Sequence, residues 1–167
     1  MSKIDVLQSV ISPVLLKRAA DLSRHLKLLH IPHALIGGLA VGLHGYPRTT
    51  KDVDFLVGNQ AFASTTPFLI YKDELKDLVR IGEIDLMSVP DKYPSLASEL
   101  RLEDDIPVIS LRGLILMKLD AFRTRDQDDI RNLLSKFPHE IRSLRDYLQS
   151  EAPLLIHRLA EILSPRR

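Results

Sequence analysis

The stretch IGGLAVGLHGYPRTTKDVDFLV, residues 36–57, decides how the fold is built. The short apolar run His33–Ile36 leads into two glycines, which predicts a strand that ends in a turn. The apolar segment Leu39–His44 then predicts a short helix, terminated by the Gly-Tyr-Pro that follows. Thr50–Val57 alternates polar with β-branched or aromatic apolar residues, the pattern of a half-buried strand. A strand, a helix and a second strand are therefore expected in close succession.

The second strand is expected to carry two acidic side chains on one face. Val53, Phe55 and Val57 turn toward the core, since alternate strand residues share a face. The opposite face then carries a polar set: Arg48, Thr50, Asp52 and Asp54. Two neighbouring carboxylates repel unless a cation neutralises them, and hard oxygen ligands of this kind suit Mg²⁺. The alternative is that Asp52 and Asp54 form one edge of a solvated strand.

Gly37 and Gly38 lie where the first strand passes into the short helix. Such a junction lets backbone N–H groups and the positive helix end approach a phosphate closely. A Gly-Gly pair by itself is usually only a turn. Its place directly before the paired aspartates favours a phosphate-binding interpretation.

Asp85 is a lone acid in the segment EIDLM, residues 83–87, within a strand predicted over Ile84–Val89. A carboxylate in an apolar strand is costly to bury unless it is paired or bound to a metal. If this strand lies beside the Asp-x-Asp strand, Asp85 reaches the same metal. The alternative is an acid at the strand edge that points to water.

The remaining elements give a helix, a β-rich middle and a helical end. Ser12 and Pro13 start a helix that ends near Pro32. Gln60–Ile81 is expected to hold strands with a loop or helical turn. The later elements are a short helix over Tyr93–Leu102, a short strand at Val108 and Ile109, a helix capped by Ser110 from Leu111 to about Arg123, and helices over Asp126–Lys136, Glu140–Gln149 and Pro153–Leu163.

This order predicts an α+β fold, a small mixed β-sheet flanked by helices with a helical C-terminal part. The chain has 167 residues and 45% hydrophobic content, enough for one domain over residues 1–167, with a core at about 30–110 and helices at about 111–163. The 23 basic and 22 acidic residues create no global field that demands DNA or a membrane. No cysteine is present, and the N-terminus MSKIDVLQSV lacks a signal-peptide pattern, so a cytoplasmic protein is expected.

Lys118 interrupts an apolar stripe on the helix predicted from Leu111. The stripe consists of Leu111, Leu114, Ile115, Leu119 and Phe122. A lysine there either meets an anion or extends its ammonium to water while its stem packs on the core. The acidic run after it, in RTRDQDD, is otherwise a charged helix start with a favourable Asp126 near the helix N-terminus.

These motifs together resemble a known family. IGGLAVGLHGYPRTTKDVDFLV followed by EIDLM is similar to the Gly-Gly, Asp-x-Asp and third-Asp signature of the DNA polymerase beta-like nucleotidyltransferase superfamily. The stretch ISLRGLILMKLDAFRTRDQDDIRNLL, residues 109–134, resembles the AbiEii-like branch, which includes toxins of toxin-antitoxin pairs. The likeness spans Ile36 to Leu134 and implies a sheet of the nucleotidyltransferase type.

The resemblance implies a function for each matching residue. Three aspartates would bind two Mg²⁺ ions and act in catalysis: Asp52, Asp54 and Asp85. Lys118 would contact the nucleotide phosphates, with Asp126 a further catalytic residue. The nucleotide-binding set would add Gly37, Gly38, Arg48, Thr50 and Asp129. Leu39 departs from the pattern, because many members carry Ser or Thr there to touch phosphate.

The expected activity is Mg²⁺-dependent transfer of a nucleoside monophosphate from an NTP to an acceptor hydroxyl, with release of pyrophosphate. RNA ends such as tRNA, a small molecule and a protein hydroxyl all fit as the acceptor. Either Asp85 or Asp126 could take the acceptor's proton. An antitoxin or another protein is a possible partner. The alternative function is a non-catalytic nucleotide-binding or partner-binding module on the same fold.

Overall fold

The structure, a computed structural model, describes residues 10–64, 70–80, 83–103 and 105–165. Its central sheet has three strands in the order β1-β2-β5: β1 His33–Ile36, β2 Val53–Val57 and β5 Ile84–Ser88. β1 runs antiparallel to β2, and β2 runs parallel to β5. A separate hairpin pairs β3 Phe62–Ser64 with β4 Ile70–Tyr71. The predicted α+β class with a small mixed sheet is confirmed.

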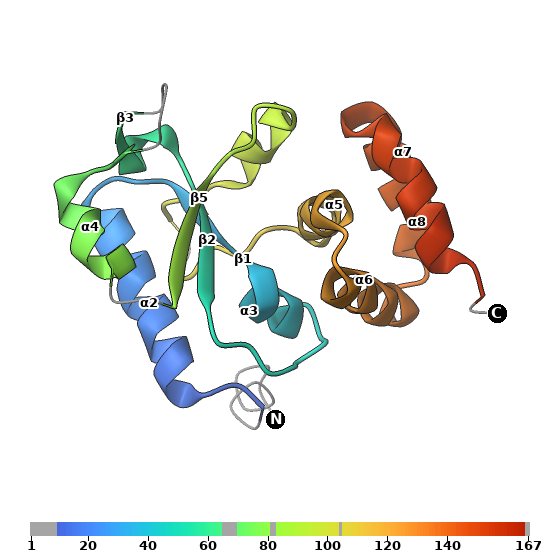
Figure 1. The fold of residues 1–167 in the computed structure, drawn as a ribbon, viewed down its shortest axis with the longest axis horizontal. Coiled ribbons are helices and arrows are strands. Elements are labelled where there is room, and N and C mark those ends of the chain that lie inside the picture. Colours follow the sequence, from blue (N-terminus) through green and yellow to red (C-terminus); the bar gives the residue numbers. More distant parts are fainter. Residues whose placement is uncertain (1–9, 65–69, 81–82, 104, 166–167) are drawn as a thin grey trace.

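Helices cover the sheet and form the whole C-terminal part (Figure 1). Their bounds are α2 Pro13–Leu28, α3 Gly37–Leu43, α4 Asp73–Arg80, α5 Leu111–Ala121, α6 Thr124–Lys136, α7 Glu140–Glu151 and α8 Ile156–Leu163, with short 3₁₀ turns at Asn59–Ala61, Pro94–Glu99 and Pro153–Leu155. As predicted, Pro13 opens α2, and the Ser110 hydroxyl caps α5 by accepting from the Gly113 N–H. Among the described residues, no helix is long and apolar enough to cross a membrane.

The two faces of the sheet pack against different helices. Val53, Phe55 and Val57 are fully buried in a cluster with α2 and α4. Ile36 and Leu56 face the other way, into a cluster that includes α5 to α8. Figure 1 shows the sheet and α2 in one half of the molecule, α5 to α8 in the other, and α3 between them. The strand alternation predicted from the sequence therefore sets which side faces the C-terminal helices.

Strand pairing brings two acids together. In the parallel register of β2 and β5, Asp54 is the direct partner of Asp85. Residues that are paired across two neighbouring strands project on the same face of the sheet, and here that face is directed toward α5. The strand of Asp85 therefore does lie beside the Asp-x-Asp strand, the condition on which its part in a shared metal site depends.

The predicted strand over Thr50–Val57 is too long at its N-terminal end. β2 begins only at Val53, whose N–H donates to the Glu83 carbonyl. Its neighbour β1 ends at Ile36, the partner of Asp54, so nothing on that side pairs with the residues before Val53. Arg48, Thr50 and Asp52 therefore lie in the loop that leads into the strand.

Other boundaries also differ from expectation. The short helix α3 starts at Gly37 rather than Leu39, and α2 ends at Leu28 because His30 adopts a left-handed backbone. The segment Tyr93–Leu102 forms a 3₁₀ helix over Pro94–Glu99. Val108 forms a single parallel bridge to Leu35 and no strand. Within Gln60–Ile81 the structure has β3, β4 and α4, while residues 65–69 and 81 lie outside the described part.

His33 is a buried histidine in β1 with both ring nitrogens engaged. Its Nδ1 lies 2.9 Å from the Ile31 carbonyl oxygen, and its Nε2 lies 2.8 Å from the Ser23 hydroxyl. The Ile31 carbonyl can only accept, so Nδ1 donates, and in the neutral ring Nε2 shares the single Ser23 hydroxyl proton with the Asp105 carbonyl oxygen, 3.2 Å from that hydroxyl. Burial lowers the pKa of His33.

We expect this histidine to make the fold less stable in mild acid. Because its folded pKa is lowered, the stability it contributes is present above the unfolded pKa of about 6.5 and is lost as pH falls toward the folded value. Denaturant unfolding should show a loss of about 1 kcal/mol between pH 7.5 and 5.5 from this group. The loss should shrink in His33→Gln and persist in His139→Gln, whose side chain is exposed. An equal slope in His33→Gln and the parent protein would contradict the assignment.

Candidate active site

A pocket of about 590 Å³ lies between the sheet and α5. This volume is in the range of small-ligand sites. One wall is acidic and carries Asp52, Asp54 and Asp85. The cationic side chains that line it are Arg48, Lys118, Arg123 and Arg125. The rest of the lining includes Gly37, Gly38, Thr50 and Asp126, so the structure brings the residues singled out from the sequence, all except Asp129, to one cavity.

The acidic wall concentrates negative charge on a partly buried carboxylate. Burial, together with the charges of Asp85 and Asp52, raises the pKa of Asp54 to about 6, although Lys118 and Arg123 oppose the shift. Asp52 and Asp85 are both exposed at the pocket. The wall is therefore electrostatically unfavourable by itself and would be stabilised by a cation.

The donor set fits Mg²⁺ with open coordination positions. In the described part of the chain, no three His, Asp or Glu side chains are arranged as a ready-made metal cluster. Mg²⁺ commonly takes only one or two carboxylates and completes its shell with water and substrate phosphate. The paired Asp54 and Asp85 supply such a minimal set, with Asp52 on the same pocket wall.

The two glycines make room for the acidic wall. Gly37 has φ +66°, and a Cβ built on it would lie 2.0 Å from Oδ2 of Asp54. A Cβ on Gly38 would lie 2.6 Å from the Thr50 hydroxyl and 3.2 Å from Nη1 of Arg48. Both positions therefore need glycine because polar side chains of this same chain occupy the space. The sequence interpretation, which gave them a turn and a phosphate-binding role, missed this packing requirement.

Replacing Gly37 by alanine should displace Asp54 and strain the backbone at positive φ. We expect a loss of about 1–3 kcal/mol in the free energy of unfolding together with loss of any activity of the pocket. Gly45→Ala is the matched control, since Gly45 also has positive φ (+106°) but has no pocket side chain near its Cβ position. Gly45→Ala should lower the melting temperature and leave activity intact. Equal activity in both variants would contradict this account of Gly37.

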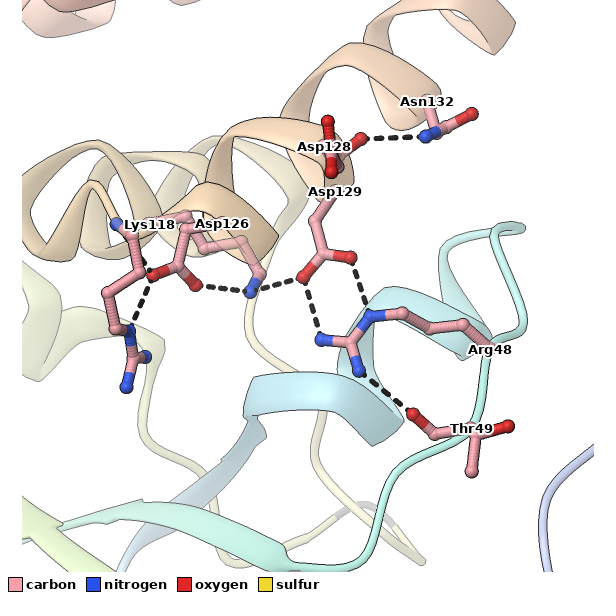
Figure 2. Close-up of polar contacts among 8 residues, drawn as sticks. Arg48, Thr49, Lys118, Asp126, Asp128, Asp129 and Asn132 are labelled. Atoms are coloured by element: carbon pink, nitrogen blue, oxygen red, sulfur yellow. Dashed lines mark hydrogen bonds and ion pairs between the residues drawn. The ribbon is translucent and has the colours of Figure 1, made fainter.

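The later motif forms a chain of ion pairs rather than a set of free groups. The buried Nζ of Lys118 lies 3.0 Å from Oδ1 of Asp126 and 2.7 Å from Oδ2 of Asp129. Asp129 also accepts two bonds from Arg48, at 2.6 and 2.7 Å (Figure 2). Asp126 accepts from the backbone N–H and from Nε of Arg123. Of the two alternatives for Lys118, the structure therefore shows the anion, and it is supplied within the chain.

Asp126 and Asp129 are placed differently from what the resemblance implies. Burial favours a higher pKa for Asp126, but the hydrogen bond from Arg123 and the pairing with Lys118 outweigh it and hold its pKa below the usual value. Both oxygens of Asp129 are taken by Arg48 and Lys118, and the hydrogen bonds to Asp129 raise the pKa of Arg48. Asp129 lies behind the pocket wall, so contact with a nucleotide would pass through these two cations.

Several residues that line the pocket or support its lining were not predicted from the sequence. Tyr93 donates to Oδ1 of Asp120, which also pairs with Lys92 at 2.7 Å. Burial, with the neighbouring Asp120, raises the pKa of Tyr93 to about 12. Met87, exposed on the same face of β5 as Asp85, adds an apolar surface. Arg123 could have been predicted from the sequence. It precedes Asp126 by three residues, which is the spacing of a contact at the N-terminus of a helix.

Comparison with known proteins finds distant likenesses among solved structures. An antigenic nucleotidyltransferase-like protein from Paracoccidioides brasiliensis is similar over 90% of this chain and 94% of its own, with 17% sequence identity and a TM-score of 0.49. No family model and no curated protein matches the chain. What the pocket can do is therefore inferred from this chain's own side chains.

Proposed function

We propose that this chain is a Mg²⁺-dependent nucleotidyltransferase, moving a nucleoside monophosphate from an NTP to an acceptor hydroxyl with release of pyrophosphate. The observation that carries the proposal is a single pocket lined both by the carboxylates of Asp52, Asp54 and Asp85 and by cations, among them Lys118 and Arg123. Phosphoryl and nucleotidyl transfer depend almost entirely on positioning and on neutralising charge, and this pocket offers groups for both.

The acidic wall is the metal-binding part of the proposal. Asp54 and Asp85 would hold Mg²⁺ together with Asp52, and the raised pKa of Asp54 supports a need for a cation there. Bound Mg²⁺ would supply charge neutralisation at the transferred phosphate and a more acidic acceptor hydroxyl.

The cationic wall is the phosphate-binding part. Lys118 keeps one N–H beyond its bonds to the two aspartates, and Arg123 reaches the pocket with an exposed side chain. Both lower the pKa of Asp54, so their charge acts across the cavity on the acidic wall. An NTP with its triphosphate on these cations would present its α-phosphorus to the acidic wall.

Asp85 is the stronger candidate to take the acceptor's proton. A general base needs a free lone pair within reach of the hydroxyl. Both oxygens of Asp126 already accept from cations and its pKa is lowered, which weakens it as a base. Asp85 is exposed in the pocket beside Asp54.

The test is to incubate the protein with each α-labelled NTP, Mg²⁺, and in turn total RNA, a protein lysate or a small-molecule extract. The resemblance to AbiEii-like transferases makes RNA ends, tRNA among them, the first acceptor to try. The proposal requires label in one acceptor, pyrophosphate in equal amount, and loss of both with the double variant Asp52→Ala, Asp54→Ala. Asp73→Asn is the matched control, because that carboxylate is almost fully exposed on α4.

A different outcome would support the non-catalytic alternative. Leu39 is buried in the core with α2 and offers no hydroxyl to a phosphate, which is the observation in its favour. Tight NTP binding without pyrophosphate release, over all three acceptor classes, would favour a nucleotide-binding module and overturn the transferase proposal.

A further inference from the structure

Five side chains of alternating charge form a continuous ladder beside the pocket. In order they are Arg48, Asp129, Lys118, Asp126 and Arg123. Every adjacent pair is joined at 2.6–3.0 Å. Figure 2 shows Arg48 and Lys118 meeting at the carboxylate of Asp129. The ladder begins and ends with a cation, so three cations are separated by two carboxylates.

The five side chains of this ladder differ in their solvent exposure. The central side chains are nearly inaccessible, with exposed fractions of 7% for Lys118, 4% for Asp126 and 1% for Asp129. The terminal arginines are more open, at 18% for Arg48 and 79% for Arg123. All three cations line the pocket, whereas Asp129 lies behind Arg48 and Lys118. Buried charges of this kind need partners on every side.

After these hydrogen bonds, the cations still have unused N–H donors for a ligand, whereas Asp129 has none. Arg48 has five N–H donors and uses three, two on Asp129 and one on the Thr49 carbonyl. Lys118 has three and uses two. Asp129 cannot donate when ionised and repels an anion. Its effect on an anionic ligand must therefore pass through the cations it holds.

The ladder also connects separate parts of the chain. Arg48 belongs to the loop before β2, Lys118 to α5, and Asp129 to α6. The bidentate contact between Arg48 and Asp129 spans 81 residues of sequence and fixes the plane of the guanidinium. Without it, the stem of Arg48 would be free to rotate in a loop that no strand pairing restrains.

From these contacts we propose that Asp129 is a positioning residue, which spaces Arg48 and Lys118 so that, with Arg123, they clamp a linked chain of three phosphates. Arg48 and Lys118 are held at one carboxylate, Asp129, and Lys118 and Arg123 at another, Asp126, so each cation has a fixed place along the ladder. They can each meet a different phosphate of a chain. The inference rests on the proposed function in taking the triphosphate of an NTP as the natural ligand, but the clamp itself needs no transfer reaction.

The first experiment measures binding of inorganic polyphosphates to the full chain by calorimetry at constant Mg²⁺. Tripolyphosphate should bind about tenfold more tightly than pyrophosphate, the factor expected for one additional charge-assisted contact, and orthophosphate should bind weakest. Equal affinity for tripolyphosphate and orthophosphate would overturn the clamp.

The second experiment tests Asp129 itself with a matched pair on one helix. Asp129→Asn keeps the shape and removes the charge, and should weaken tripolyphosphate binding about tenfold or more. Asp128→Asn, next to it on α6, removes an exposed carboxylate that pairs with Arg131 and should leave binding unchanged. Figure 2 shows Asp128 away from the ladder. Equal affinities in the two variants would refute the positioning role.

If Asp129→Asn does not fold, Arg48→Gln provides a second test of the clamp. It keeps Asp129 paired with Lys118 and should weaken tripolyphosphate binding by a similar factor. If both fold, the double variant should lose less affinity than the sum of the two single losses, because Asp129 acts in part through Arg48. Additive losses, or full affinity in Arg48→Gln, would show that Asp129 does not act through Arg48. In the NTP assay the clamp predicts a raised KM with a smaller change in kcat.

These measurements separate this inference from the proposed function. If polyphosphate binding depends on Asp129 but the protein transfers no nucleotide, the clamp proposal stands and the transferase proposal is wrong. Nucleotidyl transfer with unchanged KM in Asp129→Asn would retain the transferase and remove the clamp.

Discussion

Asp54→Asn is expected to lower nucleotidyl transfer by about 10³-fold or more while making the metal-free protein more stable. The loss of activity follows because the amide removes the negative charge that Asp54 would supply to Mg²⁺ beside Asp85. The gain in stability follows because the same charge is unfavourable in the folded state. Few substitutions are expected to move these two properties so far in opposite directions.

The sign of the stability effect comes from the raised pKa of Asp54. Burial and the charges of Asp85 and Asp52 raise it from 3.8 to about 6. A group with a raised folded pKa stabilises the fold below its unfolded pKa, and that contribution is lost as pH rises through the folded value. Above pH 6 the wild-type protein therefore carries a cost on the order of 2 kcal/mol that asparagine avoids, after allowance for solvent screening.

Melting curves of both proteins in a chelator, from pH 4 to pH 8, check this prediction. The variant's advantage should be absent near pH 4 and grow through pH 6. Added Mg²⁺ should raise the melting temperature of the wild-type protein more than that of the variant. Asp73→Asn, on exposed α4, should show neither effect. An Asp54→Asn protein less stable than wild type at pH 7.5 in chelator would contradict the electrostatic account of the acidic wall.

Lys118→Met is expected to give the largest loss of stability. It removes the central cation of the ladder and leaves the buried carboxylates of Asp126 and Asp129 with one arginine each. Removing one partner from a buried ion pair costs about 3–5 kcal/mol, and the remaining arginines favour the lower end of that range. A chain of this length should lose roughly 10 °C in melting temperature.

Denaturant unfolding at pH 7 measures the effect, with Lys92→Met as the control. Lys92 also pairs with an aspartate, Asp120 at 2.7 Å, but its side chain is 60% exposed. Exposed pairs contribute little, so Lys92→Met should change the free energy of unfolding by less than about 1 kcal/mol. Similar losses in the two variants would mean that burial does not distinguish the two lysines.

Asp54→Asn and Lys118→Met change two parts of the pocket in which charges are arranged in opposite ways. The acidic wall holds like charges together and is only partly compensated by Lys118 and Arg123, whereas the ladder pairs each of its charges directly within the chain. A wall that needs a cation is suited to binding one, and a compensated wall is suited to holding its cations in fixed positions. The contrast supports assigning the metal to the first and the phosphates to the second.

The sequence by itself determined the elements that depend on local periodicity and local breakers. The strand His33–Ile36, the buried alternation of Val53, Phe55 and Val57, and the capped start of α5 follow from side-chain patterns within a few residues, and all are present. The adjacency of Asp85 to Asp54 depended on a strand pairing that the sequence left open, and the structure supplies that pairing with Asp85 exposed on the edge strand β5.

Tertiary structure alone decided where β2 begins, what the glycines accommodate and what Lys118 binds. β2 is short because β1 ends at Ile36, and Gly37 must lack a side chain because Asp54 fills that space. Lys118 is neutralised by Asp126 and Asp129 because α5 and α6 pack together, and Arg48 joins them from a loop 81 residues away in sequence. Periodicity reports which face of an element is buried, but the identity of the group it meets depends on long-range packing, and charge compensation is a property of that packing.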